Sequence, residues 1–119
     1  MLTFMGRRVR FYRKENGRCP VEEFLDELPK KSAAKCVAVF SAVEREVVLS
    51  DRFLKKLQGQ NLYEIRVLHA RQALRFICFF GGRDLIIATH GFIKKSERTP
   101  RREIELAKRY RYDYLRRMR

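Results

Sequence analysis

Cysteines and long apolar runs are scarce in this sequence of 119 residues, and acidic residues are only half as many as basic ones. No apolar run approaches the roughly 20 residues that a helix needs to cross a bilayer. The opening segment, MLTFMGRRVRFYRK, has neither a continuous apolar stretch nor a small-residue cleavage site, so we expect no secretion signal. The three cysteines, Cys19, Cys36 and Cys78, match no zinc or redox spacing and should be reduced thiols. These absences indicate a cytoplasmic protein without a membrane segment.

The excess of basic over acidic residues leaves the chain strongly basic. It has 28 Lys and Arg residues against 14 Asp and Glu, a formal net charge of +14 and a sequence pI of about 10.4. A charge of this size favours a polyanionic partner, which could be nucleic acid, a ribosome, an anionic membrane or an acidic protein. Half of the excess lies in residues 93–119, which hold 11 basic and 4 acidic residues. A solvated helix face would explain such a run, but solubility does not require so large an imbalance over the whole chain.

Hydrophobic residues make up 45% of the chain, which is enough to form a core, so we expect one compact domain over residues 1–119. Apolar residues at alternating or helical spacing, bounded by Pro, Gly and capping residues, outline its elements. The expected elements are a strand at Arg8–Arg13, a helix that Pro20 opens and Pro29 ends, a helix at Ala33–Leu49, a connector at 51–61, strands at Leu62–Leu68, Leu74–Phe80 and Leu85–Ile93, and a helix that Thr99-Pro100 opens.

The order β-α-α-β-β-β-α predicts an α+β domain in which helices pack on one face of an antiparallel sheet. Apolar residues at helical spacing identify the buried stripes of two helices. The stripe of the second helix is expected to include Val37, Phe40, Val43 and Val47, and that of the last helix Ile104, Ala107, Tyr110 and Tyr114.

Residue parity assigns the side chains of the last three strands to two faces, because side chains alternate across a sheet. With two-residue turns at His69-Ala70 and Gly81-Gly82, one face is apolar and should pack against the helices, and it holds Tyr63, Ile65, Val67, Phe76 and Cys78. The other face holds Glu64, Arg66, Arg71, Arg75, His90, Phe92 and Lys94. Ordinary alternation on a solvated sheet is one explanation. Cations that converge from three strands with few carboxylates between them favour another, a bound anion such as phosphate.

RNA cleavage is a reaction that such a face can carry out, because RNA brings its own nucleophile, the 2′-hydroxyl. The protein must orient that hydroxyl, remove its proton, stabilise charge at phosphorus and protonate the leaving 5′-oxygen. The planar fork of Arg suits the phosphate, and a Lys or His in a cationic neighbourhood can donate the proton. Glu64 or His90 could act as the base, although Glu64 could instead pair with Arg75 and His90 could be structural. The sequence has no Asp and His cluster at ligand spacing, so we expect no metal or other cofactor.

A family resemblance rests on three groups of residues. The first is the strand motif Leu62-Tyr63-Glu64-Ile65-Arg66, and the second is Arg75-Phe76 in the next strand. The third is His90-Gly91-Phe92-Ile93-Lys94-Lys95-Ser96-Glu97-Arg98-Thr99-Pro100, followed by Glu103-Ile104 and Ala107. Together with the basic first strand and Gly17-Arg18-Cys19-Pro20-Val21, they resemble the phage-derived HigB-like toxins of the RelE/ParE superfamily. The resemblance covers residues 8–115 and implies a compact RelE-like domain.

The resemblance implies an mRNA interferase, a metal-independent endonuclease that cleaves mRNA in the A site of the 70S ribosome and arrests translation. It also implies a HigA-like antitoxin with a helix-turn-helix domain, and contact with operator DNA only through the toxin–antitoxin complex. The family's active-site arginines and lysines correspond to Arg66, Arg75, Lys94 and Lys95 here. The assignment of acid and base varies across the superfamily, so the resemblance identifies no general base.

Two other functions remain open from the sequence. The same fold could belong to a ParE-like toxin that inhibits gyrase without cutting RNA, or to a non-catalytic module that binds RNA or the ribosome by charge. No membrane contact is expected in any of these cases. Besides the catalytic candidates Arg66, Arg75, Lys94, Lys95, His90 and Glu64, the expected RNA-binding residues are Arg71, Arg98, Arg101, Arg102, Lys108 and Arg109.

Overall fold

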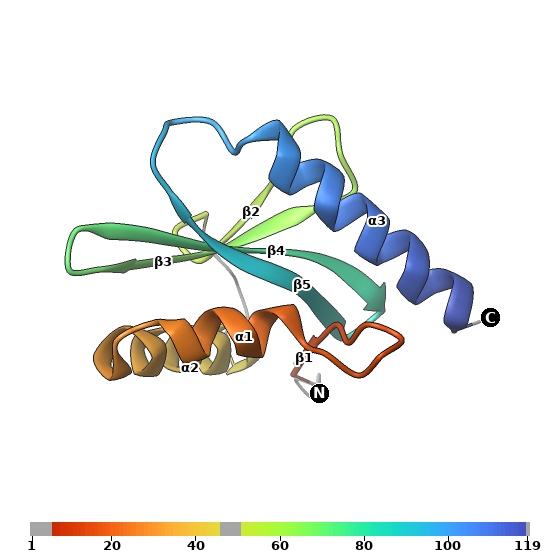
Figure 1. Cartoon of the computed structure of the whole chain (residues 1–119), viewed down its shortest axis with the longest axis horizontal. Helices are drawn as coiled ribbons and strands as arrows, with labels where there is room; N and C mark the ends of the chain where they lie inside the picture. Colours follow the sequence, from red (N-terminus) through yellow and green to blue (C-terminus); the bar gives the residue numbers. More distant parts are fainter. Residues whose placement is uncertain (1–5, 46–50, 119) are drawn as a thin grey trace, which may run out of the picture.

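Five strands and three helices make up the fold, which a computed structural model describes for residues 6–45 and 51–118 (Figure 1). The strand order in the sheet is β1-β5-β4-β3-β2, and the expected α+β class is confirmed. The expected end of the second helix at Leu49 lies outside the described residues. No described helix is long and apolar enough to cross a membrane. In chain order the elements are β1 (Arg8–Phe11), α1 (Pro20–Glu27), α2 (Lys30–Arg45), β2 (Leu54–Lys56), β3 (Tyr63–His69), β4 (Gln72–Gly82), β5 (Leu85–Lys94) and α3 (Arg101–Arg117).

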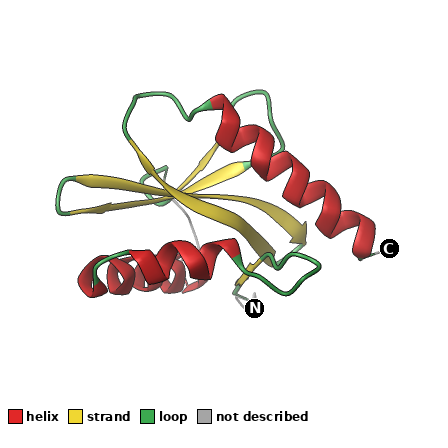
Figure 2. Ribbon diagram, viewed as in Figure 1, coloured by secondary structure: helices red, strands yellow, loops and turns green. Residues whose placement is uncertain are grey.

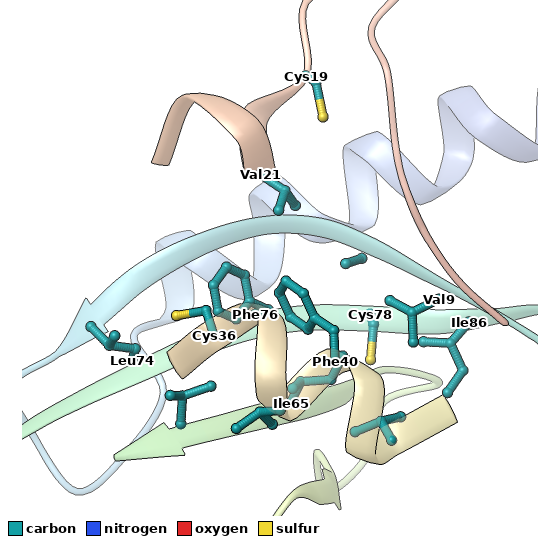
Figure 3. Close-up of a cluster of buried hydrophobic side chains, with 14 residues drawn as sticks. Val9, Cys19, Val21, Cys36, Phe40, Ile65, Leu74, Phe76, Cys78 and Ile86 are labelled. Atoms are coloured by element: carbon teal, nitrogen blue, oxygen red, sulfur yellow. The ribbon is translucent and has the colours of Figure 1, made fainter. Parts of the chain in front are cut away.

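Helices α1 and α2 cover one face of the sheet and enclose the larger part of the core (Figures 1 and 3). Pro20 lies in the first turn of α1, where its missing N–H costs no hydrogen bond. In α2, Val37 was expected in the buried stripe but is 52% exposed, and Val39 is buried instead, while Val47 lies outside the described residues. The strand residues expected on this face are confirmed there, namely Tyr63, Ile65, Val67, Phe76 and Cys78. All three cysteines are free and buried, in agreement with the expected reduced thiols.

Helix α3 lies on the opposite face of the sheet, so the prediction that the helices share one face was wrong (Figure 2). The physical reason lies in β4, which is buried on both faces from Leu74 to Phe79 and therefore needs cover on both. The expected stripe of α3 is confirmed, and it provides that cover over Ile77 and Phe79. The residues of α3 in this second cluster are Ile104, Ala107, Tyr110 and Tyr114.

Contacts near both ends of α3 hold it in place. Towards its C-terminus, the hydroxyl of Tyr12 donates to Asp113 at 2.5 Å, and the ring of Tyr12 stacks on Tyr110 at 4.7 Å between centroids. Just before its N-terminus, the hydroxyl of Thr99 donates to the carboxylate of Glu64 on β3. This face of the sheet is therefore divided, because α3 covers its apolar end and leaves the basic end bordered by loops.

The two edge strands differ from the expected antiparallel meander. β1 pairs with β5 in parallel, with Arg8 opposite Leu85, so the sheet is mixed rather than antiparallel throughout. β2 is an extra strand within the expected connector, and it pairs antiparallel with β3 so that Lys55 is opposite Glu64. Three residues are too few to show an alternating period, and for this reason the sequence did not reveal the strand.

Both hairpin turns fall at other residues than expected, yet the faces are unchanged. The β3–β4 turn is Ala70-Arg71, with φ of 50° and 66°, and the β4–β5 turn is Arg83-Asp84 rather than Gly81-Gly82. Each turn shifts the pairing near the basic end by an even number of residues, which preserves the faces of the strand residues there, whereas a register shift between Ile77 and Cys78 alters the pairing further along β4 and β5. Arg71 is the exception, because it lies in the turn. The face that carries Glu64, Arg66, Arg75, His90, Phe92 and Lys94 is confirmed.

Candidate active site

Basic side chains line a groove at the uncovered end of the divided face. One part is a hollow of about 530 Å³ lined by Arg66, Ala73, Arg75, Lys94, Lys95, Ser96 and Glu97. The adjoining part is a hollow of about 560 Å³ lined by Lys55, Lys56, Leu57, Gln58, Glu64, Arg66, Lys94, Glu97, Arg98, Thr99 and Ile104. Because both hollows share Arg66, Lys94 and Glu97, they form one continuous surface, the basic groove.

Three strands present the cations at the centre of the basic groove. Arg66 of β3 is directly opposite Arg75 of β4, and Lys94 of β5 is opposite Ala73, two residues before Arg75. A guanidinium nitrogen of Arg66 donates to the backbone carbonyl of Asp51 at 3.0 Å, which restrains that side chain at the rim. Like charges directly opposite each other in a sheet repel, so the arrangement favours an anion between them.

Glu64 forms the floor of the basic groove. Its side chain is 2% exposed, its Oε1 lies 3.7 Å from Nε of Arg75, and its Oε2 accepts the hydrogen bond from Thr99. The ion pair with Arg75, which the sequence left open, is thus present, although the partners are diagonal rather than opposite in register. Burial lowers the pKa of Arg75 and Arg66 lowers it further, while Glu64 opposes the shift. Arg75 stays charged, because a guanidinium loses its proton only far above neutral pH.

Lys94 has the environment of a proton donor. Burial lowers its pKa, and the charges of Arg75, Arg66 and Lys55 act in the same direction against the opposing effect of Glu64. A lowered pKa brings the ammonium closer to the neutral range, where a general acid is most effective. Its neighbour Lys95 is exposed and lines only the first hollow.

His90 lies under α3 and is not among the residues that line the basic groove. Its Nε2 is 3.1 Å from Oε1 of Glu103 on α3, and its Nδ1 is 2.9 Å from the hydroxyl of Thr89. Burial lowers the pKa of His90, and the hydrogen bond and charge of Glu103 oppose that shift. In this placement His90 connects β5 to the first turn of α3, which is the structural role that the sequence left open.

One protein family matches most of the chain. Its model, for phage-derived proteins similar to Gp49, matches residues 23–112, a range that contains every residue lining the basic groove. The chain belongs to the phage-derived Gp49-like protein family (DUF891). No curated protein matches the chain. Membership of the Gp49-like family by itself assigns no reaction, so the chemistry has to be argued from the groove.

The other RNA-binding candidates of this Gp49-like chain are dispersed. Arg98 lines the basic groove, whereas Arg71 is exposed at the β3–β4 turn. Two candidates on α3 have acidic neighbours, since Arg102 lies 3.5 Å from Glu103 and Lys108 lies 3.7 Å from Glu105. The candidates exposed along α3 are Arg101, Arg102, Lys108 and Arg109.

Sequence reasoning missed several groove residues of the Gp49-like chain. Lys55 and Lys56 come from β2, and their only sequence signal was a basic pair within a connector. Thr99 was expected to cap the last helix, but Pro100 occupies the N-cap position and the Thr99 hydroxyl bonds to Glu64. Glu97 lines both hollows, and it belongs to the His90–Pro100 motif that resembles HigB-like toxins, but the sequence assigned it no role. The placement of the two lysines depends on the pairing of β2 with β3, and that of Thr99 and Glu97 on how the segment after β5 folds back over β3. No local sequence pattern indicates either contact.

Proposed function

We propose that this Gp49-like protein is the toxin of a type II toxin–antitoxin system and acts as a ribosome-dependent mRNA endonuclease. The observation that carries the proposal is the convergence of Arg66, Arg75 and Lys94 around the buried Glu64 in an open groove. The resemblance to HigB-like toxins supplies the reaction class. The net charge of +14 suits a protein that acts on mRNA while docked on rRNA.

The proposed reaction is the attack of an mRNA 2′-hydroxyl on the adjacent phosphate. The O2′–P bond forms and the P–O5′ bond breaks, which leaves a 2′,3′-cyclic phosphate and a 5′-hydroxyl. Arg66 and Arg75 bind the phosphate oxygens and stabilise the extra negative charge of the transition state. Lys94, whose pKa is lowered by burial, gives its proton to the leaving 5′-oxygen.

We assign Glu97 as the group that accepts the 2′-hydroxyl proton. Its side chain is exposed and lines both hollows of the basic groove, so it can meet the substrate and later release the proton to water. Glu64 is already paired with Arg75 and bonded by Thr99, and it serves to position Arg75. His90 is engaged by Glu103 and Thr89, and it serves to position α3.

The proposed role implies specific partners. The 70S ribosome presents the mRNA, and basic side chains beyond the groove, such as Arg101 and Arg109 on α3, bind rRNA phosphates. A HigA-like antitoxin with a helix-turn-helix domain neutralises the toxin in the cytoplasm. Operator DNA is bound only through the complex of toxin and antitoxin.

Incubation of the purified protein with mRNA, with and without 70S ribosomes, tests the proposal. Fragments that end in a 2′,3′-cyclic phosphate are expected only when ribosomes are present. Arg75→Ala and Lys94→Ala should each lower the cleavage rate by about 100-fold, because each removes charge stabilisation or the proton donor. Lys31→Ala should cleave normally, because Lys31 is exposed on α2, on the other side of the sheet.

Several outcomes would contradict the proposal. If the Arg75→Ala protein has an unchanged circular dichroism spectrum and cleaves mRNA at the wild-type rate, Arg75 has no catalytic role. Continued translation together with DNA-damage signalling in cells that express the protein would indicate a gyrase inhibitor. Salt-sensitive RNA binding without any cleaved product would indicate a non-catalytic module.

A further inference from the structure

A second basic hollow lies beside α3, next to the basic groove. Its volume is about 400 Å³, and it is enclosed by the end of β2, the β2–β3 connection and one side of α3. Its side chains supply cations and two amides, and none of the described residues that line it is acidic. The lining residues are Lys56, Gly59, Gln60, Asn61, Leu62, Lys108 and Arg111.

Arg111 is the lining residue whose hydrogen bonding is incomplete. Its guanidinium lies over the ring of Phe79, with Cζ 5.7 Å from the ring centroid, and its Nε is buried without a hydrogen-bond acceptor. Within residues 6–45 and 51–118, the only other buried side-chain nitrogen or oxygen without a hydrogen-bond partner is Nε of Arg75, in the basic groove. A buried donor without an acceptor is unfavourable, and an oxyanion is the kind of ligand that supplies one. The two hollows therefore share a feature that points to the same ligand chemistry.

Lys56 connects the second hollow to the basic groove, because its side chain lines both. A continuous surface on which basic side chains outnumber acidic ones attracts a polyanion along its length. We propose that Lys56, Lys108 and Arg111 form a second phosphate site, which binds a backbone phosphate of the RNA strand whose reacting phosphate occupies the basic groove. That the ligand is this RNA strand rests on the proposed endonuclease function. Two fixed phosphates would set the direction of the strand and so decide which 2′-hydroxyl meets Glu97.

The composition of the second hollow favours RNA over an acidic protein. Protein interfaces obtain most of their affinity from apolar and aromatic side chains at their centre. Here the one apolar side chain of the lining, Leu62, is 1% exposed and has almost no surface to offer. The amides of Gln60 and Asn61 can instead bond to phosphate or ribose oxygens beside the cations.

Fluorescence anisotropy with a labelled 12-nucleotide single-stranded RNA, measured over a series of KCl concentrations, tests the second site. The Lys56→Ala/Lys108→Ala double variant should bind about tenfold more weakly at 0.1 M KCl, and the slope of log K against log [KCl] should become shallower by about one. The matched control is Lys30→Ala/Lys31→Ala, which removes the same charge from exposed positions of α2. This control should keep a slope close to that of the wild type.

A second variant separates specific contact from general charge. Arg111→Lys keeps the net charge but removes the planar fork, and it should bind the RNA several-fold more weakly than the wild type at equal salt. Thermal unfolding of each variant verifies that it is folded. Equal slopes for the two double variants, or wild-type affinity in Arg111→Lys, would overturn the second site, including the case in which an acidic protein proves to bind there.

Failure of this inference can be distinguished from failure of the proposed function. If the wild type cleaves mRNA on ribosomes but the two double variants show the same salt slope, the endonuclease stands and the second site does not. If the predicted loss of slope is found but no mRNA is cleaved, the second site stands as an RNA contact and the endonuclease does not.

Discussion

At the scale of single residues, the charges of the basic groove depend on neighbours that do not reach a ligand. Arg75 is a largely buried cation, and such a charge is tolerated only when an opposite charge lies close to it. Glu64 provides that charge, and Thr99 in turn bonds to Glu64. The orientation of Arg75 is therefore set from below the groove, by a carboxylate and a hydroxyl.

Replacement of Thr99 by Val tests this support, because it removes the hydroxyl and keeps the shape. The buried carboxylate of Glu64 would lose a donor, and the free energy of unfolding should fall by about 1–3 kcal/mol in urea titrations. The rate of the proposed mRNA cleavage should fall as well, by about tenfold, because Arg75 is less firmly placed. Thr99→Ser retains the hydroxyl and should behave as the wild type. Equal stability of Thr99→Val and Thr99→Ser would show that the hydrogen bond contributes little.

The buried His90 should make stability depend on pH in a defined direction. Burial lowers its pKa in the folded protein below the ordinary value of 6.5, so the unfolded chain takes up more protons as the pH falls below that value. The free energy of unfolding should thus be highest above about pH 6.5 and should decline towards pH 5. Urea titrations at several pH values measure this decline.

The second histidine supplies the control for that measurement. His90→Gln removes the titrating ring and should flatten the decline between pH 7 and pH 5, whereas His69→Gln, in the β3–β4 hairpin, should keep it. An identical pH profile for the wild type and His90→Gln would argue against a role of His90 in this dependence.

At the scale of elements, β5 packs against α1 at Gly91 without space for a side chain. A Cβ at this position would lie 2.5 Å from Cδ2 of Phe24 and 2.6 Å from Cε2 of Phe76. Two aromatic rings, one on α1 and one on β4, thus occupy the space that any larger residue would need. The contact between α1 and the sheet depends on the absence of a side chain there.

Gly91→Ala should lower the free energy of unfolding by about 1–3 kcal/mol, because the two rings must shift to admit one methyl group. Gly82→Ala is the matched control, since a Cβ there has no heavy atom within 4 Å and the change should have little effect. Thermal or urea unfolding of both variants gives the comparison. Similar losses in the two variants would mean that the rings adjust at no cost.

The sequence predicted the groove residues on strands better than those on loops. Arg66, Arg75 and Lys94 could be placed on one face because alternation is a local rule, and an even shift of either turn does not alter it. Thr99 and the lysines of β2 could not be placed in the groove from the sequence, because their positions depend on contacts between segments far apart in the chain. The sequence could not predict the face of the sheet on which α3 packs, for a similar reason. The apolar stripe of α3 fits any apolar surface, and the sheet has an apolar surface on both faces only once its strands have assembled.

At the scale of the whole molecule, positive charge is concentrated beyond what the fold itself can neutralise. The chain has twice as many basic as acidic residues, 28 against 14. Such an excess destabilises the compact state through self-repulsion, and the repulsion is relieved by salt or by a bound anion. Stability should therefore respond to the kind of anion present as well as to ionic strength.

Phosphate should stabilise the protein more than chloride at the same ionic strength. At tenfold the dissociation constant, a bound phosphate adds about 1.4 kcal/mol, which corresponds to a rise of about 6 °C in the unfolding midpoint. Differential scanning calorimetry in matched buffers measures the rise. In the Arg66→Ala/Lys94→Ala variant the difference should shrink, whereas Lys30→Ala/Lys31→Ala should retain it. An equal response of both variants would point to a general solvent effect of phosphate rather than to binding.

The buried cysteines have a practical consequence for experiments on this protein. Burial raises the pKa of the Cys36 thiol to about 11 and also raises the pKa values of Cys19 and Cys78, so almost no thiolate is present at neutral pH. Maleimide reagents should leave the folded wild-type protein unlabelled. Ser96→Cys would then carry the single reactive thiol, at the exposed rim of the basic groove. A fluorophore attached there would test in real time whether RNA enters the groove, with all three native cysteines left in place.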